Sequence, residues 1–197
     1  MPKVTEEHRA ARRQQILSAA MRCVAREGFH KTTMAHVIGE SGLSAGAVYG
    51  YFKGKNEIIR AIADVAIGGM AAALHELADR PGTVAPADGL DLVLSHIEGL
   101  AASEQGDLTR VAVQAWAEAC RDDEVRGIAR QRLLLVRDGW QAVLGRAQRD
   151  GTLDPEVDVA VAAQAMLGLM PGFVLQRLLI GDVSRASYVS GFRALVG

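Results

Sequence analysis

The sequence predicts an all-α protein in which a small N-terminal helical domain precedes a larger helical bundle. Three observations favour this fold class: apolar residues recur at three- and four-residue steps, capping residues stand where helices would begin, and glycines stand where they would end. With 49% hydrophobic and 23% charged residues, the 197-residue chain has the composition of a globular protein. We expect two domains, covering residues 1–56 and 57–197.

The first predicted helix runs from Glu6 to Glu27. Gly28 follows it, at a position where a left-handed backbone is cheap only for glycine. The apolar residues of this segment form one stripe, typical of an amphipathic helix packed on one side. They are Ile16, Leu17, Ala20, Met21 and Val24.

Two short helices come next. Thr32 or Thr33 would cap the first, which ends at Gly42, and Ser44 would cap the second, which runs from Ala45 to about Phe52. Two short helices joined by a turn of about three residues with a glycine match the helix-turn-helix, whose second helix enters the major groove of DNA. The pattern therefore predicts a DNA-binding domain at the N-terminus.

The second of these helices is built for close approach to a surface. Ala45 and Gly46 are small, although each glycine costs a helix about 1 kcal/mol relative to alanine. Tyr49 and Tyr51 can offer hydroxyls to phosphates, and one of the two would instead pack in the core. Lys53 and Lys55 add positive charge.

Charge is distributed unevenly along the chain. Residues 1–60 hold ten Lys or Arg and five Glu, giving +5, and the other 137 residues hold 12 basic and 18 acidic side chains, giving −6, so the total is −1. A basic N-terminal third suggests that only this part meets a polyanion. A solvated charged face is the alternative interpretation.

The segment TTMAHVIGESGLSAGAVYGYFKGKNEII resembles the N-terminal domain of the TetR family of bacterial transcription regulators. The resemblance extends over roughly residues 9–60. Gly39 and Ser41 depart from the family pattern, both by exchange of one small residue for another. The matching positions are Thr32, Thr33, Ile38, Gly42, Leu43, Ser44, Gly46, Tyr49, Phe52, Lys55 and Glu57.

The resemblance implies roles for the candidate DNA-binding residues. The pair Thr32 and Thr33 begins the motif, and Thr33 would contact phosphates together with Tyr49 and Lys55. Base edges would be faced by Ser44, Ala45 and Gly46, and the DNA backbone would be approached by Tyr51 or Lys53. It also implies a homodimer on a palindromic double-stranded operator and a small-molecule effector bound by the C-terminal domain.

The rest of the chain is predicted to be helical. A long helix over 56–80 is interrupted at Gly68 and Gly69, a loop follows, and Asp154 with Pro155 would begin the longest apolar helix as N-cap and first-turn proline. Further helices are expected over 90–103, 108–121, 122–151 and 184–197.

The segment from Val157 to Ile180 is apolar almost all round. A helix of this kind is buried on every side, either inside a monomer or between the body and a second copy, and we favour the homodimer. Methionines and aromatic residues of the C-terminal domain could outline an apolar effector pocket, or be plain core. The candidates for this pocket are Met70, Trp116, Cys120, Trp140, Met166, Met170 and Phe173.

Other classes of function have less support. The five histidines are scattered and no catalytic, phosphate-loop or metal-ligand spacing occurs, so we expect no enzyme activity, no catalytic residue, no metal and no cofactor. Cys23 and Cys120 are expected to be buried apolar residues. No signal peptide and no segment long and apolar enough to cross a membrane is expected, which favours the cytoplasm. An effector-independent or architectural DNA-binding protein is the alternative, and a helical enzyme is a distant one.

Overall fold

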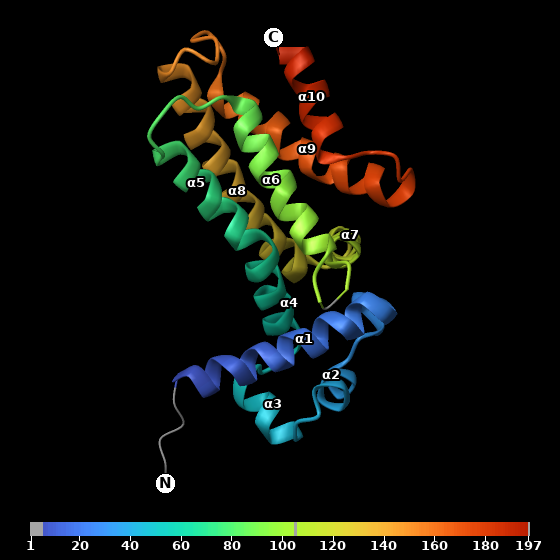
Figure 1. Cartoon of the computed structure of the whole chain (residues 1–197). Helices are drawn as coiled ribbons and strands as arrows, with labels where there is room; N and C mark the ends of the chain where they lie inside the picture. The colour runs from blue at the N-terminus through green and yellow to red at the C-terminus, as the bar shows by residue number, and fades with distance from the viewer. Residues whose placement is uncertain (1–5, 105, 197) are drawn as a thin grey trace. The chain divides into compact units, whose positions relative to one another are not determined.

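The computed structural model describes residues 6–104 and 106–196, and these form helices and no strand (Figure 1). The predicted all-α fold class is confirmed. Packing divides the chain into two compact units, one made of 6–65, 101–104 and 106–129, the other of 66–100 and 130–196. The functional boundary at 56/57 stays a prediction, because compactness alone does not test it.

The first unit is built around α1 (Glu6–Lys31). Its predicted apolar stripe, from Ile16 to Val24, is buried, and Gly28 breaks the helical geometry with φ 84° and ψ 160°. Three short helices and one longer helix join it, and the first turns of α8 complete the unit. These elements are α2 (Met34–Ser41), α3 (Ala45–Tyr51), α4 (Lys55–Ala63), α7 (Leu108–Ala119) and α8 (Asp123–Arg149).

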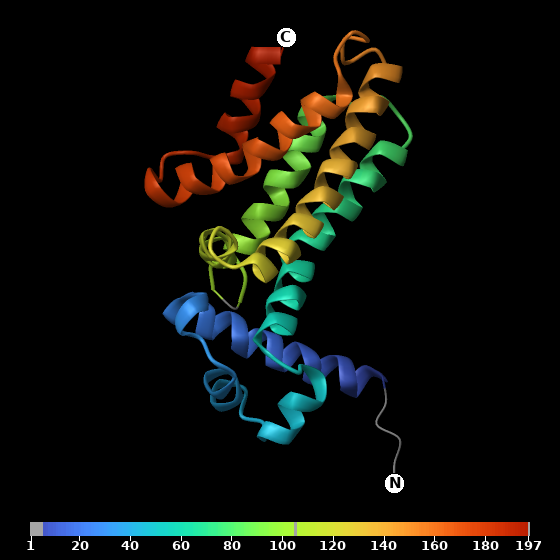
Figure 2. The ribbon, with the colours of Figure 1, turned by 180° about the vertical axis from the view of Figure 1, so that it is seen from behind.

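The second unit contains the remainder of α8 with α5 (Gly69–Asp79), α6 (Pro86–Ala101), α9 (Val159–Leu179) and α10 (Arg185–Val196). Figures 1 and 2 show α5, α6 and α8 side by side. Two glycines allow this close packing. A methyl group on Gly139 would lie 2.9 Å from Cβ of Leu74, and one on Gly89 would lie 2.6 Å from the ring of Trp140, which is fully buried.

The helix expected over 56–80 is interrupted, but the interruption lies at Asp64–Gly68 rather than at Gly68 and Gly69. A π-helical segment, η1 (Asp64–Gly68), separates α4 from α5. The boundary between the two compact units falls inside η1, between Val65 and Ala66. π-helical turns within α-helices are rare and occur often at functional sites.

Two local predictions are wrong. The longest apolar helix does not begin at Asp154 and Pro155, because Asp158 is its N-cap and accepts hydrogen bonds from the main-chain N of Ala160 and Val161 at 2.8 and 3.1 Å. Cys120 is exposed, because it follows the last turn of α7 at a chain reversal. Cys23 is buried as expected, and its burial raises the pKa of its thiol, which keeps it protonated.

The expectation that no segment is long and apolar enough to cross a membrane does not hold for the apolar helix α9. It is the one helix in 6–104 and 106–196 that is long and apolar enough to cross a bilayer by length and composition, and the core helix of a globular protein can meet the same criterion. Only 28% of its apolar window is buried within the chain, so much of α9 is left uncovered.

Candidate nucleic-acid interface

The helix-turn-helix is formed by α2, α3 and the turn between them. Thr33 caps α2 by accepting a hydrogen bond from His36 N at 3.3 Å, and Ser44 caps α3 by accepting one from Ala47 N at 3.3 Å. Gly42 ends α2 in the left-handed conformation, with φ 68° and ψ 14°. These are the N-caps and the stop that the sequence indicates, with Thr33 rather than Thr32 as the first cap.

The helix α3 has one buried and one exposed face. Val48 and the C-cap residue Phe52 are 0% and 2% exposed, and they hold the helix on the core of the first unit. Tyr49 is 44% exposed, and Tyr51 is half-buried. The exposed face is completed by Ser44, Ala45, Gly46 and Gly50. The predicted base-facing residues therefore share one accessible face with Tyr49.

Contacts from α1 fix the turn and the end of α3. Gln15 donates a hydrogen bond from Nε2 to the carbonyl oxygen of Ser41 at 2.8 Å. Ser41 Oγ accepts a hydrogen bond from Leu43 N at 3.2 Å, which closes the turn. The guanidinium of Arg13 lies 5.2 Å from the ring centroid of Phe52, within the range of a cation–π interaction. The long first helix thus supports the two short ones, which could not be stable alone.

Thr33 and Lys55 both line one small pocket, whose other lining residues are mostly apolar side chains of α1, α2 and α4. Thr33 stands at the N-terminus of α2 and Lys55 at the N-terminus of α4. Helix N-termini carry unpaired N–H groups and partial positive charge, which favours phosphate. Phosphate contacts are predicted for both residues, so we refer to Thr33 and Lys55, with the helix N-termini that carry them, as the phosphate clamp.

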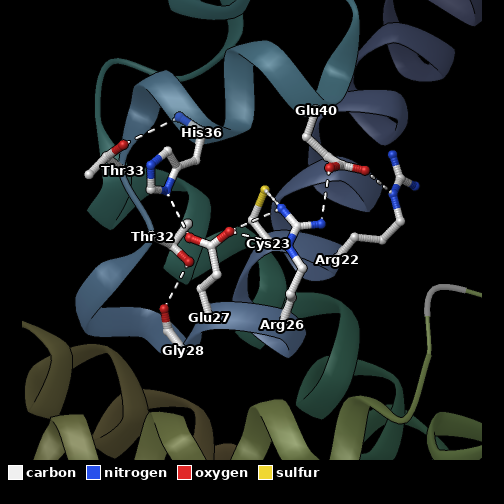
Figure 3. Close-up of polar contacts among 9 residues, drawn as sticks. All are labelled: Arg22, Cys23, Arg26, Glu27, Gly28, Thr32, Thr33, His36 and Glu40. Carbon is white, nitrogen blue, oxygen red and sulfur yellow. Dashed lines mark hydrogen bonds and ion pairs between the residues drawn. The ribbon is translucent and has the colours of Figure 1, made fainter.

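An ion-pair network fastens α2 to α1 (Figure 3). Glu40 pairs with Arg22 at 2.8 Å and with Arg26 at 3.3 Å, and Glu27 pairs with Nδ1 of His36 at 3.1 Å. Hydrogen bonds from Arg22 and then Arg26 hold the pKa of the Glu40 carboxyl below its ordinary value. Arg22 and Arg26 therefore neutralise carboxylates of the protein, and the excess positive charge of this part resides on other residues.

Two further residues predicted to bind DNA, Lys53 and Thr32, have hydrogen-bond partners within the fold. Lys53 donates from Nζ to the carbonyl oxygen of Tyr49 at 3.0 Å, at the C-terminal end of α3, where a cation is favoured. Thr32 is 4% exposed and its hydroxyl donates to the carbonyl oxygen of Gly28 at 2.8 Å. Their contacts with DNA stay predictions.

Sequence reasoning did not single out His36. The residue is exposed on α2, one turn after Thr33, and Glu27 orients its imidazole (Figure 3). The feature of the sequence that could have pointed to His36 is its place as a polar residue three positions after the N-cap Thr33. The ring adds a hydrogen-bonding group to a surface that otherwise has few.

The candidate effector residues fall in two different units. Met70, Trp140 and Phe173 are buried in the second unit, on α5, α8 and α9. The remaining two of that unit, Met166 and Met170, are buried on α9. Trp116 is half-buried on α7 in the first unit, next to the exposed Cys120. The structure thus brings five of the seven together in one unit.

Comparisons with known proteins agree with this fold along the whole chain. Residues 16–62 match the family described as bacterial regulatory proteins, tetR family, and residues 91–196 match the C-terminal family described as BetI-type transcriptional repressor. The chain is 30% identical over 191 residues to YfiR of Bacillus subtilis, an uncharacterized HTH-type transcriptional regulator, covering 96% of this chain and 90% of YfiR. It is 28% identical to the HTH-type transcriptional regulator TtgR of Pseudomonas putida, covering 92% and 87%.

Solved structures share the same architecture. GusR of Salmonella enterica superposes with a TM-score of 0.77 at 25% identity, over 99% of this chain and 97% of GusR. FadR of Bacillus subtilis in complex with stearoyl-CoA gives 0.76 at 22% identity, over 93% and 97%. A helix-turn-helix with an exposed small-residue face, followed by a helical bundle, defines a transcriptional regulator with a DNA-binding domain. The chain belongs to the TetR family of bacterial regulatory proteins.

Proposed function

We propose that this protein is a cytoplasmic, ligand-responsive repressor that binds a palindromic DNA operator as a homodimer and is released by a small, largely apolar effector. The observation that carries the proposal is the exposed face of α3. Ser44, Ala45, Gly46 and Tyr49 are accessible there, while Val48 anchors the opposite face. A helix with small exposed residues can enter the major groove closely.

The α3 helix would read its operator with few side-chain hydrogen bonds. Between Ala45 and Tyr51 it has no Arg, Asn or Gln, the residues that make bidentate base contacts. Specificity would then depend on van der Waals contact with thymine methyl groups, on main-chain approach and on DNA deformability. The phosphate clamp, Thr33 and Lys55, would set the register on the backbone.

The uncovered surface of α9 supports a homodimer. Val161 is 60% exposed, Leu175 is 40%, Leu179 is 78% and the adjoining Ile180 is 66%. Large apolar side chains in such number on one helix indicate a contact surface. A second copy of α9 would cover them through a two-fold interface, and two helix-turn-helix motifs would then meet two half-sites.

The buried methionines and aromatic residues of the second unit support an apolar effector. Met70, Met166 and Met170 are adaptable side chains buried in the same unit as the large rings of Trp140 and Phe173. Proteins of the same fold are known in complex with stearoyl-CoA and with triclosan. Trp116 and Cys120, in the first unit, stay predictions as parts of the pocket.

Effector binding would act through the chain segment that joins the units. In the proposed mechanism the ligand shifts the segment from Asn56 to Asp79, within which η1 lies. This shift changes the separation of the two α3 helices of the homodimer. A coupling free energy of about 1–3 kcal/mol between effector and operator sites is ordinary for such a system.

One experiment tests the ligand-responsive part. A duplex selected by the protein would be held at half-saturation in a fluorescence anisotropy assay while apolar compounds, including long-chain acyl-CoAs and triclosan, are added. We expect at least one to release the DNA and to change the fluorescence of Trp140. Binding that no compound weakens, with tryptophan fluorescence unchanged throughout, would argue for an effector-independent repressor.

A further inference from the structure

The first compact unit contains more than the DNA-reading helices. It also includes 101–104 and 106–129, which are distant in sequence from α1 to α4. This segment contributes α7 and the first turns of α8, and α7 packs on α1. We call the part from Gln114 to Glu124 the α7–α8 corner.

The corner touches the start of α4. Asn56, the residue after Lys55, donates a hydrogen bond from Nδ2 to Oε2 of Glu124 at 2.6 Å. The main chain at Glu124 is held by Asp122, because the main-chain N of Glu124 donates to Oδ1 of Asp122 at 2.8 Å, and Asp122 also accepts from Val125 N at 3.0 Å. The corner thus presents a carboxylate acceptor to the first turn of α4.

The corner also touches the chain that leads into α2. A methyl group on Gly28 would lie 3.4 Å from Oε1 of Gln114, so the Gln114 carboxamide lies beside this glycine, and its buried Oε1 has no hydrogen-bond partner in the part of the chain that the structure describes. The carbonyl oxygen of Gly28 in turn accepts hydrogen bonds from Thr32. Thr33, the N-cap of α2, comes next in the chain.

We propose that the α7–α8 corner positions the phosphate clamp, with Glu124 holding the turn that carries Lys55 and Gln114 holding the turn that leads to Thr33. The inference rests on the proposed binding of DNA. A carboxylate so near a phosphate contact opposes DNA binding by its charge, so Glu124 would favour binding only through geometry. Since α8 is one helix from Asp123 to Arg149, a displacement of α8 would reach Lys55 through Glu124.

The opposite signs of charge and geometry give a sharp test. Kd for a duplex selected by the wild-type protein would be measured for Glu124→Ala, Glu124→Gln, Asn56→Ala and the Asn56→Ala/Glu124→Ala double variant. Glu118→Ala is the matched control, because it removes the same charge from α7 in the same unit. Circular dichroism would confirm that each variant is folded.

We expect Glu124→Ala and Asn56→Ala each to raise Kd about three- to tenfold. The Kd of the double variant should be no higher than that of the single variant with the higher Kd. Glu124→Gln keeps an acceptor oxygen and should bind within about twofold of wild type. In a Lys55→Ala background, Glu124→Ala should cause no further loss of affinity, because its geometric contribution passes through Lys55, and removal of its charge should if anything tighten binding slightly. Glu118→Ala should bind as wild type or slightly more tightly.

Tighter or unchanged binding by Glu124→Ala would overturn the proposal, as would additive effects of the two single variants. Additive loss in the Lys55→Ala background would mean that Glu124 acts elsewhere. A wild-type protein that selects no duplex would instead contradict the proposed function itself, so the two failures are distinguishable.

Discussion

Thr32 donates two hydrogen bonds to the carbonyl oxygen of Gly28, one from its main-chain N at 3.1 Å and one from its hydroxyl at 2.8 Å. Gly28 has a positive φ of 84°, so the chain leaves α1 at a point where glycine is favoured. The two bonds close the connection to α2 and leave Thr33 free to cap that helix. The threonine pair therefore combines a buried residue that fastens the turn and an exposed one that faces solvent.

Thr32→Val should destabilise the fold. The variant keeps the size of the side chain but removes a buried hydroxyl that is bonded to Gly28, so the free energy of unfolding should fall by about 1 kcal/mol. Urea denaturation measures this change, and Thr32→Ser, which keeps the hydroxyl, is the control. Equal stability of Thr32→Val and wild type would contradict the structural role of the hydroxyl.

Substitutions at two adjacent residues of α3 should have different effects: Val48→Ala should lower stability, and Tyr49→Phe should weaken DNA binding. Val48→Ala removes a fully buried side chain and should cost about 2 kcal/mol of stability. Tyr49→Phe removes an exposed hydroxyl and should change stability by less than about 0.5 kcal/mol, while it raises the operator Kd about tenfold. Thermal melts and DNA titrations of both variants check this. Wild-type affinity in Tyr49→Phe would exclude its hydroxyl from the phosphate contacts.

Lys55→Ala should weaken binding to all DNA sequences alike. A lysine that neutralises one phosphate contributes about one unit to the slope of log Kd against log salt concentration. Titrations of a selected duplex and an unrelated duplex at several salt concentrations measure the slope. An unchanged slope would remove Lys55 from the phosphate contacts.

Low pH should reduce the stability of the second unit by protonating the Asp150 carboxylate. Its carboxylate accepts hydrogen bonds from Arg146 Nε at 2.9 Å and from Val84 N at 2.8 Å, and these partners, Arg146 first, lower its pKa. A lowered folded-state pKa gives stability that is present above the ordinary aspartate pKa of about 3.9 and is lost as the pH falls through the lower folded value. Wild type should therefore exceed Asp150→Asn in unfolding free energy near pH 6, and the difference should vanish in strong acid. A difference independent of pH would exclude this ionisation.

The proposed homodimer should separate when charge is placed on α9. Leu175→Glu and Val161→Glu each put a carboxylate on an exposed apolar position of that helix. Light scattering coupled to size exclusion should give twice the chain mass of 21.0 kDa for wild type and the single chain mass for the variants. Ala72→Glu, on the exposed side of α5, is the control and should stay dimeric. A monomeric wild type would rule out the dimer.

Local features were predictable because they depend on neighbouring residues. Gly42 ends α2 and Ser44 begins α3 through hydrogen bonds within three or four residues, and the sequence shows those residues directly. The predicted helix start at Asp154 and Pro155 was wrong, and Asp158 caps this helix instead. The proline after Asp154 was a weaker determinant of the helix start than the two main-chain N–H groups whose hydrogen bonds Asp158 accepts.

Long-range contacts could not be read from spacing. Nothing near Asn56 indicates Glu124, which lies 68 residues later, and nothing near Gly28 indicates Gln114. The exposure of Cys120 depends likewise on where α7 ends against the rest of its unit. For the candidate DNA interface, the sequence was sufficient to identify α3 by its small residues and tyrosines. The structure was needed to distinguish the exposed Tyr49 from the half-buried Tyr51.

Selection of bound duplexes from a random DNA pool, at a low and a high salt concentration, tests the central claim most directly. A homodimer that places two α3 helices in the major groove should enrich a palindrome whose half-sites are about one helical turn, or a multiple of it, apart, at both salt concentrations. No enrichment, with binding that collapses as salt rises, would mean that the basic N-terminal part is a non-specific electrostatic surface, and would contradict the claim of operator-specific repression.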